Sequence, residues 1–198
     1  MKLVLATQNP KKLKEMNEIL SHLGVEVVSE AELGVRIEVE ETGETFPDNA
    51  RLKATAVMQA TGLPAVADDS GLCVDALNGG PGVYSARFGG EGLDDKGRYT
   101  LLLEMLRGQT DRAAHFHTSI VCASPNGDEL VCEGECPGTI AFAPMGEGGF
   151  GYVPVFFVPE LRKTFGQLTA EEKASVSHRG KALRAFAAAL DDYLKGNE

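Results

Sequence analysis

The opening of the chain alternates between strand and helix patterns, and this constrains the fold more than any other feature of the sequence. Residues 2–7 form a short apolar run that stops at a Gln-Asn-Pro-Lys-Lys stretch. Leucine and methionine then recur at helical spacing over residues 13–23, and residues 25–28 predict a second strand. A strand, a helix and a strand in close succession predict a βαβ unit and favour an α/β sheet.

Later segments continue this pattern. Residues 65–67 and 72–74 are apolar and flank a predicted turn, and residues 113–139 alternate around a predicted hairpin turn at 125–128. One predicted helix has an inner face made of Phe46, Ala50, Ala54 and Val57. The last predicted helix carries Leu183, Phe186, Leu190 and Leu194 on one face. We therefore expect one α/β domain over residues 1–198, with an antiparallel excursion in its second half.

Composition excludes several classes of protein. The chain has 198 residues, enough for a sizeable core, and its net charge of −10 argues against binding to a nucleic-acid backbone. The sequence has no apolar run long enough to cross a bilayer or to form a signal peptide, so we expect a cytoplasmic protein without a membrane partner. The four cysteines form no CxxC pair and are interpreted as reduced core thiols, with a zinc site or a disulfide as the alternative.

Residues 7–12 lie where the first strand gives way to a helix. Free backbone N–H groups and the helix dipole favour an anion at such a place. Thr7 and Asn9 offer hydrogen bonds, and Lys12 offers a point charge for a phosphate. The alternative is an ordinary helix N-cap with solvated lysines.

Two adjacent carboxylates, Asp68 and Asp69, follow a strand of small apolar residues, and we expect them at the end of that strand. Neighbouring carboxylates repel unless a divalent cation or a proton relieves them, and Mg²⁺ suits oxygen ligands and phosphate substrates. Glu40 or Glu41 can supply a further metal carboxylate, and periodicity does not say which of them points inward. The alternative is a set of solvated acids, with an Asx-turn at residues 68–71.

Aromatic and basic residues mark two further segments. Phe150 and Tyr152 are two residues apart, so in an extended chain both rings lie on one side and can sandwich a planar base. Lys173 precedes the last predicted helix, which His178 and Arg179 open; cations there oppose the helix dipole, and this indicates a ligand. Core aromatic packing and hydrogen bonds to protein carbonyls are the alternatives.

His115 and His117 alternate on one face of a predicted strand. Two imidazoles on one face can chelate a metal ion. Because no third His or Cys follows at a recognisable ligand spacing, we interpret both histidines as structural.

Six motifs in a fixed order resemble those of one known family. They are TQNPKK, EET, DDSGL, GGPGVYSARF, GGFGY and EEKASVSHRG, and the match runs from about residue 3 to residue 195. The chain resembles the inosine triphosphate pyrophosphatase family, the XTP/dITP diphosphatases that clear damaged purine nucleotides. The resemblance implies an elongated α/β fold with a long twisted mixed sheet, flanking helices and two lobes around a central cleft. It also implies a homodimer that hydrolyses ITP, dITP or XTP to the monophosphate and pyrophosphate with Mg²⁺.

The resemblance further implies roles for individual residues. Asp69 stands at a position that resembles the family's catalytic base and metal ligand. Glu40 or Glu41 resembles the second carboxylate that binds the metal, and the neighbouring Asp68 is a further candidate for a metal ligand. The residues that resemble substrate contacts are Thr7, Gln8, Asn9, Pro10, Lys11, Lys12, Ser70, Phe150, Gly151, Tyr152, Val153, Lys173, His178 and Arg179.

The base pocket departs from the family pattern at one position. The family usually has Phe-Gly-Tyr-Asp, whereas this chain has Val153 in the last place. A missing carboxylate there affects base selectivity more than hydrolysis. Arg179 can meet the O6 acceptor of inosine or xanthosine, which adenine lacks. Two alternatives stay open: a nucleotide-binding regulator without catalysis, and a triphosphate pyrophosphatase with another base preference.

Overall fold

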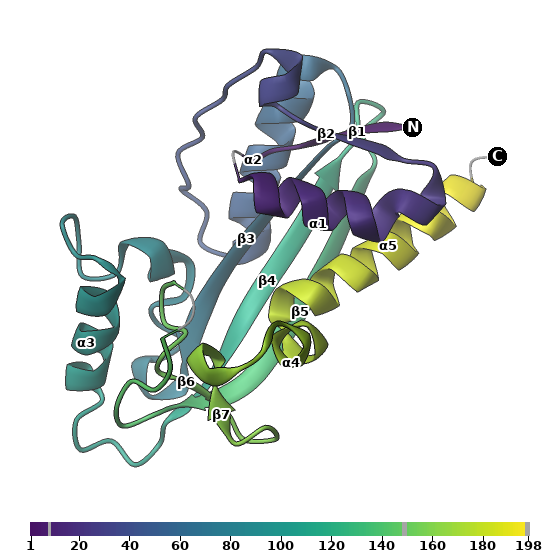
Figure 1. Cartoon of the computed structure of the whole chain (residues 1–198). Coiled ribbons are helices and arrows are strands. Elements are labelled where there is room, and N and C mark those ends of the chain that lie inside the picture. The colour runs from purple at the N-terminus through teal and green to yellow at the C-terminus, as the bar shows by residue number, and fades with distance from the viewer. Residues whose placement is uncertain (8, 148–149, 197–198) are drawn as a thin grey trace. The chain divides into compact units, whose positions relative to one another are not determined.

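The computed structural model describes residues 1–7, 9–147 and 150–196 of the chain (Figure 1). The strands are β1 Lys2–Leu5, β2 Glu26–Ser29, β3 Ala65–Val74, β4 Ala113–Ala123, β5 Glu129–Ile140, β6 Phe156–Val158 and β7 Lys163–Thr164. The α-helices are α1 Pro10–Leu20, α2 Phe46–Thr61, α3 Asp95–Met105, α4 Ala170–Val176 and α5 His178–Gly196. Short 3-10 helices span Ser21–Leu23, Ala31–Leu33, Asp75–Leu77, Gly82–Arg87 and Phe165–Gln167. Within the described ranges, no helix combines the length and the apolar character that crossing a membrane requires.

Seven strands form one sheet in the order β2-β1-β3-β4-β5-β6-β7. β1 runs parallel to both β2 and β3, with Leu5 opposite Ser29 in β2 and Val66 in β3. β6 runs antiparallel to both β5 and β7. The prediction of an α/β fold with a mixed sheet and flanking helices is therefore confirmed, and so is the βαβ opening.

The chain divides into two compact units that interleave in sequence. Unit 1 comprises Met1–Asp69, Thr118–Gly134 and Lys181–Glu198, and unit 2 comprises Ser70–His117 and Glu135–Gly180. Strands β3, β4 and β5 each contribute residues to both units. The expectation of one two-lobed domain over the whole chain stays a prediction.

Helices bury both faces of the central strands β1, β3 and β4 in unit 1, whereas one face of β5 there is exposed. One face packs against α1 and α5 in a core that includes Leu3, Leu5, Met16, Leu20, Val66, Ile120, Cys122, Leu183, Phe186 and Leu190. The opposite face packs against α2 through Ala50, Ala54, Ala67, Val121 and Ala123. Successive side chains of a strand point to opposite faces, so burial on both faces makes these strands continuous apolar runs.

The position of α2 follows directly from its sequence. Thr45 caps its first turn, and Gly62 ends it with a φ of 67°, a left-handed conformation that suits glycine. The residues predicted for its inner face are all buried, namely Phe46, Ala50, Ala54 and Val57. Asn49, also buried, is the polar member of this face.

In unit 2 the apolar core lies on one face of the sheet. It includes Leu72 and Val74 of β3, Phe116 of β4, Cys136 and Ile140 of β5, and residues of α3, β6 and the loops that follow. Most of the intervening positions of the same strands are partly or fully exposed, as His115, His117 and Glu135 show. This part of the sheet therefore alternates between apolar and polar side chains.

Two local predictions were wrong. The expected turn at residues 68–71 does not form, because β3 continues without a break from Ala65 to Val74. Its neighbour β1 ends at Leu5, opposite Val66, whereas β4 on the other side is 11 residues long and can support the whole of β3. Asp68 and Asp69 therefore lie within a strand, just beyond the end of β1.

The predicted start of the next strand, at Tyr152, was also wrong. Residues 151–155 form turns, and β6 begins only at Phe156. Tyr152 is 4% exposed while Phe150 is 80% exposed, so the two rings do not share one side as the extended chain required. Burial of the Tyr152 ring in the core of unit 2 takes precedence over strand geometry here.

Candidate active site

Residues 7–12, which are predicted to bind phosphate, lead into the N-terminus of α1 in unit 1. Asn9 caps α1, and its Oδ1 accepts a hydrogen bond from Lys11 N at 3.0 Å. Thr7 Oγ1 accepts one from Asn9 N at 3.2 Å, and Pro10 occupies the first helical position, where its missing N–H is not needed. Gln8 lies outside the described residues.

Lys12 and Asp68 form an ion pair in unit 1. Lys12 Nζ lies 2.7 Å from Asp68 Oδ2, and the Asp68 side chain is only 5% exposed. The predicted alternative, in which the lysines of this loop are merely solvated, is therefore wrong for Lys12, while Lys11 is exposed. An ammonium group has three donors, so Lys12 can keep Asp68 and still bind a phosphate oxygen.

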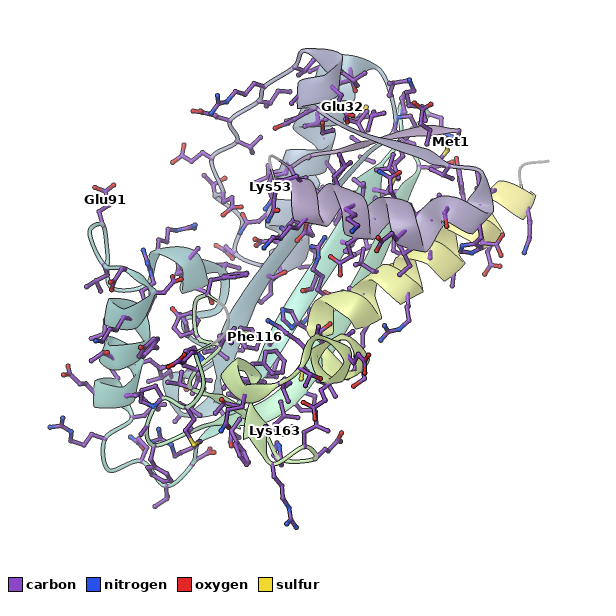
Figure 2. The ribbon with its side chains drawn as sticks, in the orientation of Figure 1. Met1, Glu32, Lys53, Glu91, Phe116 and Lys163 are labelled. Atoms are coloured by element: carbon purple, nitrogen blue, oxygen red, sulfur yellow. The ribbon has the colours of Figure 1, made fainter. Side chains whose placement is uncertain are left out.

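A second lysine, Lys53, joins two of the predicted metal ligands. It extends from α2 (Figure 2), and its Nζ lies 2.7 Å from Glu41 Oε1 and 3.5 Å from Asp69 Oδ1. The buried Asn49, one turn earlier on α2, donates from Nδ2 to Asp69 Oδ2 at 3.3 Å. Asn49 Oδ1 also accepts a hydrogen bond from Gly43 N at 2.8 Å, and this holds the segment that carries Glu40 and Glu41 against α2. Glu41 thus faces Asp69 through Lys53, whereas Glu40 is exposed.

The protonation equilibria of this group follow from burial and neighbouring charges. Burial raises the pKa of Asp69, and repulsion from Glu41 raises it further, against the lowering effects of Lys53 and the Asn49 hydrogen bond. Burial lowers the pKa of Lys53, but attraction to Asp69 and Glu41 outweighs it, so the net shift is upward. Lys53 is therefore a stable cation, and Asp69 is a carboxyl group of increased basicity.

The chemistry of these donors fits a magnesium ion. Glu41 and Asp69 are oxygen ligands whose charges already converge on one cationic group, the Lys53 ammonium. Mg²⁺ is usually bound through one or two carboxylates together with substrate phosphates. Asp68 fits this role less well because its carboxylate is buried and paired with Lys12.

The basic residues of the last motif gather around aromatic rings in unit 2. The His178 ring stacks on Phe116 with centroids 4.8 Å apart and an interplanar angle of 14°. Lys173 Nζ lies 5.7 Å from the Phe165 ring centroid, and burial lowers the pKa of this lysine. Arg179, partly buried, is the second residue of α5. His178 and Arg179 open the last helix as predicted.

The Phe150–Val153 segment divides into an exposed and a buried part. Phe150 is exposed, and Gly151 N donates to Asp95 Oδ2 at 2.8 Å. Val153 is 6% exposed and belongs to the core of unit 2. The Tyr152 hydroxyl donates to Ser85 O at 2.8 Å.

Ser85 binds the backbone of β3 at Leu72, three residues after Asp69. Its buried Oγ accepts from Leu72 N at 2.9 Å and donates to Gly82 O at 2.6 Å. Ser70, two residues before Leu72, is exposed. The Tyr152–Ser85–Leu72 chain of hydrogen bonds therefore fixes the segment that carries Ser70.

Sequence reasoning missed Asn49, Lys53 and Ser85. Asn49 and Lys53 each precede an alanine of the inner face of α2, Ala50 and Ala54, by one residue. Polar residues on the border of an otherwise apolar helix face were the available signal. Ser85 lies within the GGPGVYSARF motif, but the motif does not reveal its role, because its partners are backbone groups.

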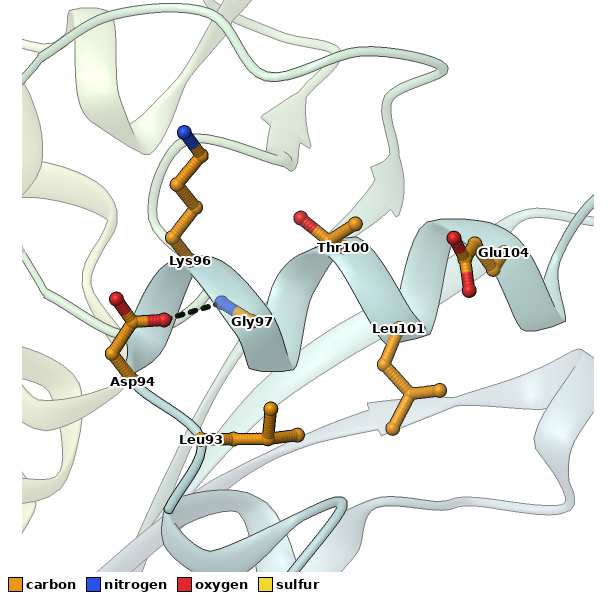
Figure 3. Close-up of a pocket in the computed structure, with 7 residues that line it drawn as sticks. All are labelled: Leu93, Asp94, Lys96, Gly97, Thr100, Leu101 and Glu104. Atoms are coloured by element: carbon orange, nitrogen blue, oxygen red, sulfur yellow. Dashed lines mark hydrogen bonds between the residues drawn. The ribbon is translucent and has the colours of Figure 1, made fainter.

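A separate surface hollow of about 470 Å³ lies beside α3 in unit 2 (Figure 3). Asp94 caps this helix, with its Oδ1 accepting from Gly97 N at 2.7 Å. The lining residues are Leu93, Asp94, Lys96, Gly97, Thr100, Leu101 and Glu104. None of them was predicted to take part in the chemistry, and their mixed charges point to no particular ligand.

Comparison with known proteins decides the family. The sequence model of the Ham1 family matches residues 3–189. The chain belongs to the Ham1 family. Among curated Ham1 relatives, the dITP/XTP pyrophosphatase of Exiguobacterium sp. is 50% identical over 196 residues, covering 99% of this chain and 100% of the relative. The dITP/XTP pyrophosphatase of Thermus thermophilus is 52% identical over 194 residues, covering 97% and 93% respectively.

Solved Ham1 structures share the fold. The Ham1 protein of Staphylococcus aureus has a TM-score of 0.90 at 40% identity and covers 100% of both chains. The HAM1 protein of Coxiella burnetii has a TM-score of 0.92 at 42% identity and covers 97% of this chain and 99% of its own. The family resemblance inferred from the six motifs is confirmed.

Proposed function

We propose that this protein is a nucleoside triphosphate pyrophosphatase that hydrolyses dITP, XTP and ITP to the monophosphate and pyrophosphate, and so removes deaminated purines from the nucleotide pool. The observation that carries the proposal is the Lys53 ammonium placed between Glu41 and Asp69, in a chain about 50% identical to proteins named dITP/XTP pyrophosphatase.

Mg²⁺ is the proposed cofactor, and Asp69 and Glu41 are the residues that would hold it. When bound, it supplies a Lewis acid that neutralises charge on the phosphate oxygens. Asp69 takes a proton from a water molecule at a carboxylate oxygen, and the water oxygen forms a bond to the α-phosphorus. The bond between the α-phosphorus and the bridging oxygen breaks, and pyrophosphate leaves with that oxygen.

The chain's own cations take up the remaining phosphate charge. Lys12 and the N-terminus of α1, with Thr7 and Asn9, are the proposed triphosphate contacts in unit 1. In unit 2, Lys173, His178, Arg179 and the Phe150–Val153 segment stay the predicted contacts to base and phosphate. Tyr152 and Val153 contribute through packing, since both side chains are buried.

Arg179 is the proposed source of base selectivity. Its guanidinium can donate to O6 of hypoxanthine or xanthine, whereas the 6-amino group of adenine offers no acceptor. Arg179→Ala should therefore reduce the preference for ITP over ATP by at least ~10-fold, a typical loss for one charge-assisted hydrogen bond. An unchanged ratio of kcat/KM values would remove Arg179 from the account of selectivity.

A panel of triphosphates tests the function. Purified protein is incubated with Mg²⁺ and, separately, dITP, XTP, ITP, ATP, GTP and modified pyrimidine triphosphates, and pyrophosphate and orthophosphate are measured apart. The proposal predicts pyrophosphate release, with kcat/KM for dITP and XTP at least ~10²-fold above that for ATP. Release of no pyrophosphate would favour a regulator, and equal rates for all bases would contradict the proposed substrate class.

Assembly and location rest on the family resemblance. We propose a homodimer in the cytoplasm, on the same basis as the substrate class. Light scattering of the purified chain tests the dimer, and a monomer would leave the proposed chemistry untouched because Asp69, Glu41 and Lys53 all belong to one chain.

A further inference from the structure

Two histidines and a glutamate lie close together on the polar face of the sheet in unit 2. Ile140 N donates to Arg112 O at 2.8 Å, which sets the antiparallel register of β5 against β4. In this register His117 of β4 lies directly opposite Glu135 of β5, and His115 is two residues along the same face. The core of unit 2 packs against the other face, where Phe116 and Cys136 are buried.

The ligand atoms of the three side chains already converge. His117 Nδ1 lies 3.0 Å and His115 Nε2 lies 4.0 Å from Glu135 Oε1. One atom from each residue can be chosen so that all lie within 4.8 Å of one another. In residues 1–7, 9–147 and 150–196, no other three His, Cys, Asp or Glu side chains meet this criterion.

We propose that His115, His117 and Glu135 form a binding site for a divalent transition-metal ion of the Zn²⁺ type. Two imidazole nitrogens and one carboxylate oxygen are ligands that tetrahedral Zn²⁺ accepts, with the fourth position left to water. Ligand atoms around such an ion lie ~3.3 Å apart, as follows from metal–ligand distances near 2.0 Å. The Glu135 side chain is 57% exposed and can turn to close the small remaining gap.

The backbone favours this site because it holds the ligands before any ion arrives. Alternate residues of one strand and the facing residue of its neighbour have fixed spacings in a sheet. The site thus loses little chain entropy when it binds. Sequence reasoning missed it because the third ligand comes from the next strand, 18 residues from His117.

The proposed site differs in chemistry from the Glu41–Asp69 pair. Imidazole ligands select ions such as Zn²⁺, Co²⁺ and Ni²⁺, whereas Mg²⁺ is bound by oxygen ligands. Binding at His115, His117 and Glu135 is therefore expected in the presence of excess Mg²⁺. It does not depend on the proposed catalytic function.

Spectroscopic titration with Co²⁺, a coloured substitute for Zn²⁺, tests the proposal. The full chain is first treated with a chelator, and Co²⁺ is then added in a buffer containing excess Mg²⁺. We expect one Co²⁺ ion per chain, with visible ligand-field bands and without a thiolate charge-transfer band. The H115Q/H117Q double variant should bind Co²⁺ at least ~10²-fold more weakly, because losing even a supporting contact of a ligand costs 10- to 100-fold. His22→Gln, at an exposed histidine in unit 1, is the matched control and should bind as the wild type does.

Three results would overturn the site: no binding by the wild type, a thiolate band that assigns the ion to cysteine, or equal binding by the double variant. Circular dichroism establishes that the double variant is folded. If it is not, Glu135→Gln replaces it, since this exposed residue can be changed with little effect on folding, and the same loss of binding is required.

Discussion

Strands β3 and β4 are buried on both faces in unit 1, whereas in unit 2 the apolar core lies on one face of the sheet, although both strands contribute to both units. In unit 1 the α2-facing positions of β3 and β4 are Ala67, Val121 and Ala123, all buried. The corresponding face in unit 2 carries His115, His117 and Glu135. A single strand such as β4 can therefore be buried on both faces at one end and alternate between buried and partly exposed side chains at the other.

The difference shows how charged groups are accommodated next to a buried strand. Asp69 lies two residues beyond Ala67 on β3, on the face that α2 covers, and α2 supplies Asn49 and Lys53 as its partners. Asp68 points to the other face and is paired with Lys12. In unit 2, where the polar face is partly open, the side chains need no such partners from a covering helix.

The largest stability effect is expected where the sheet is covered on both sides. Leu5→Ala removes a fully buried side chain of β1 and should lower the free energy of unfolding by ~2–5 kcal/mol through lost burial and an unfilled cavity. His115→Ala, on the open face of unit 2, should change it by less than about 0.5 kcal/mol when metal is removed by chelation. Urea unfolding measures both. Equal losses of unfolding free energy for the two variants would contradict the difference in burial between unit 1 and the polar face of unit 2.

The Asp68–Lys12 pair should have a smaller effect on stability. Asp68→Asn removes a charge-assisted hydrogen bond from a nearly buried position and should cost ~1.5–3 kcal/mol in the free energy of unfolding. A double-mutant cycle with Lys12→Met isolates the pair, and the exposed Asp192→Asn serves as control. Additive single losses would mean that the ion pair contributes nothing.

Lys53 sharpens the comparison through pH dependence. Lys53 lowers the pKa of Asp69, so Lys53→Met should raise that pKa above its already raised value. Since the proposed base acts only when ionised, the acidic limb of kcat/KM against pH should move to higher pH, and activity should be lost on the acidic side of the profile. Lys14→Met, at an exposed lysine of α1, should leave the profile unchanged. If the acidic limb does not move in the Lys53 variant, Lys53 does not control the pKa of the catalytic base.

Much of the fold follows from local sequence patterns. The parallel opening, the inner face of α2 and the β4–β5 hairpin are set by side-chain periodicity and by turn residues near each element, and all were predicted correctly. The path of β3 through Asp68 and Asp69 could not be predicted in the same way. It depends on β4, a strand more than 40 residues later in the chain, and local turn preference favoured the wrong answer.

The candidate site was partly accessible from sequence. Motif residues such as Asp69, Lys12 and the Glu40–Glu41 stretch stand out by charge next to apolar segments. The choice of Glu41 as the residue facing Asp69 depends on Lys53, which projects from a separate helix. The role of Val153 was likewise hidden, because only the tertiary structure shows that its side chain is in the core of unit 2.

The most direct test of the account is the rate of pyrophosphate release from dITP by Asp69→Asn. Its turnover should fall at least ~10²-fold, the usual size of a general-base contribution. The variant should stay folded, because asparagine matches aspartate in size and its Oδ1 can still accept a hydrogen bond from Asn49 Nδ2. A variant that is folded and releases pyrophosphate at nearly the wild-type rate would contradict the assignment of Asp69 as the base.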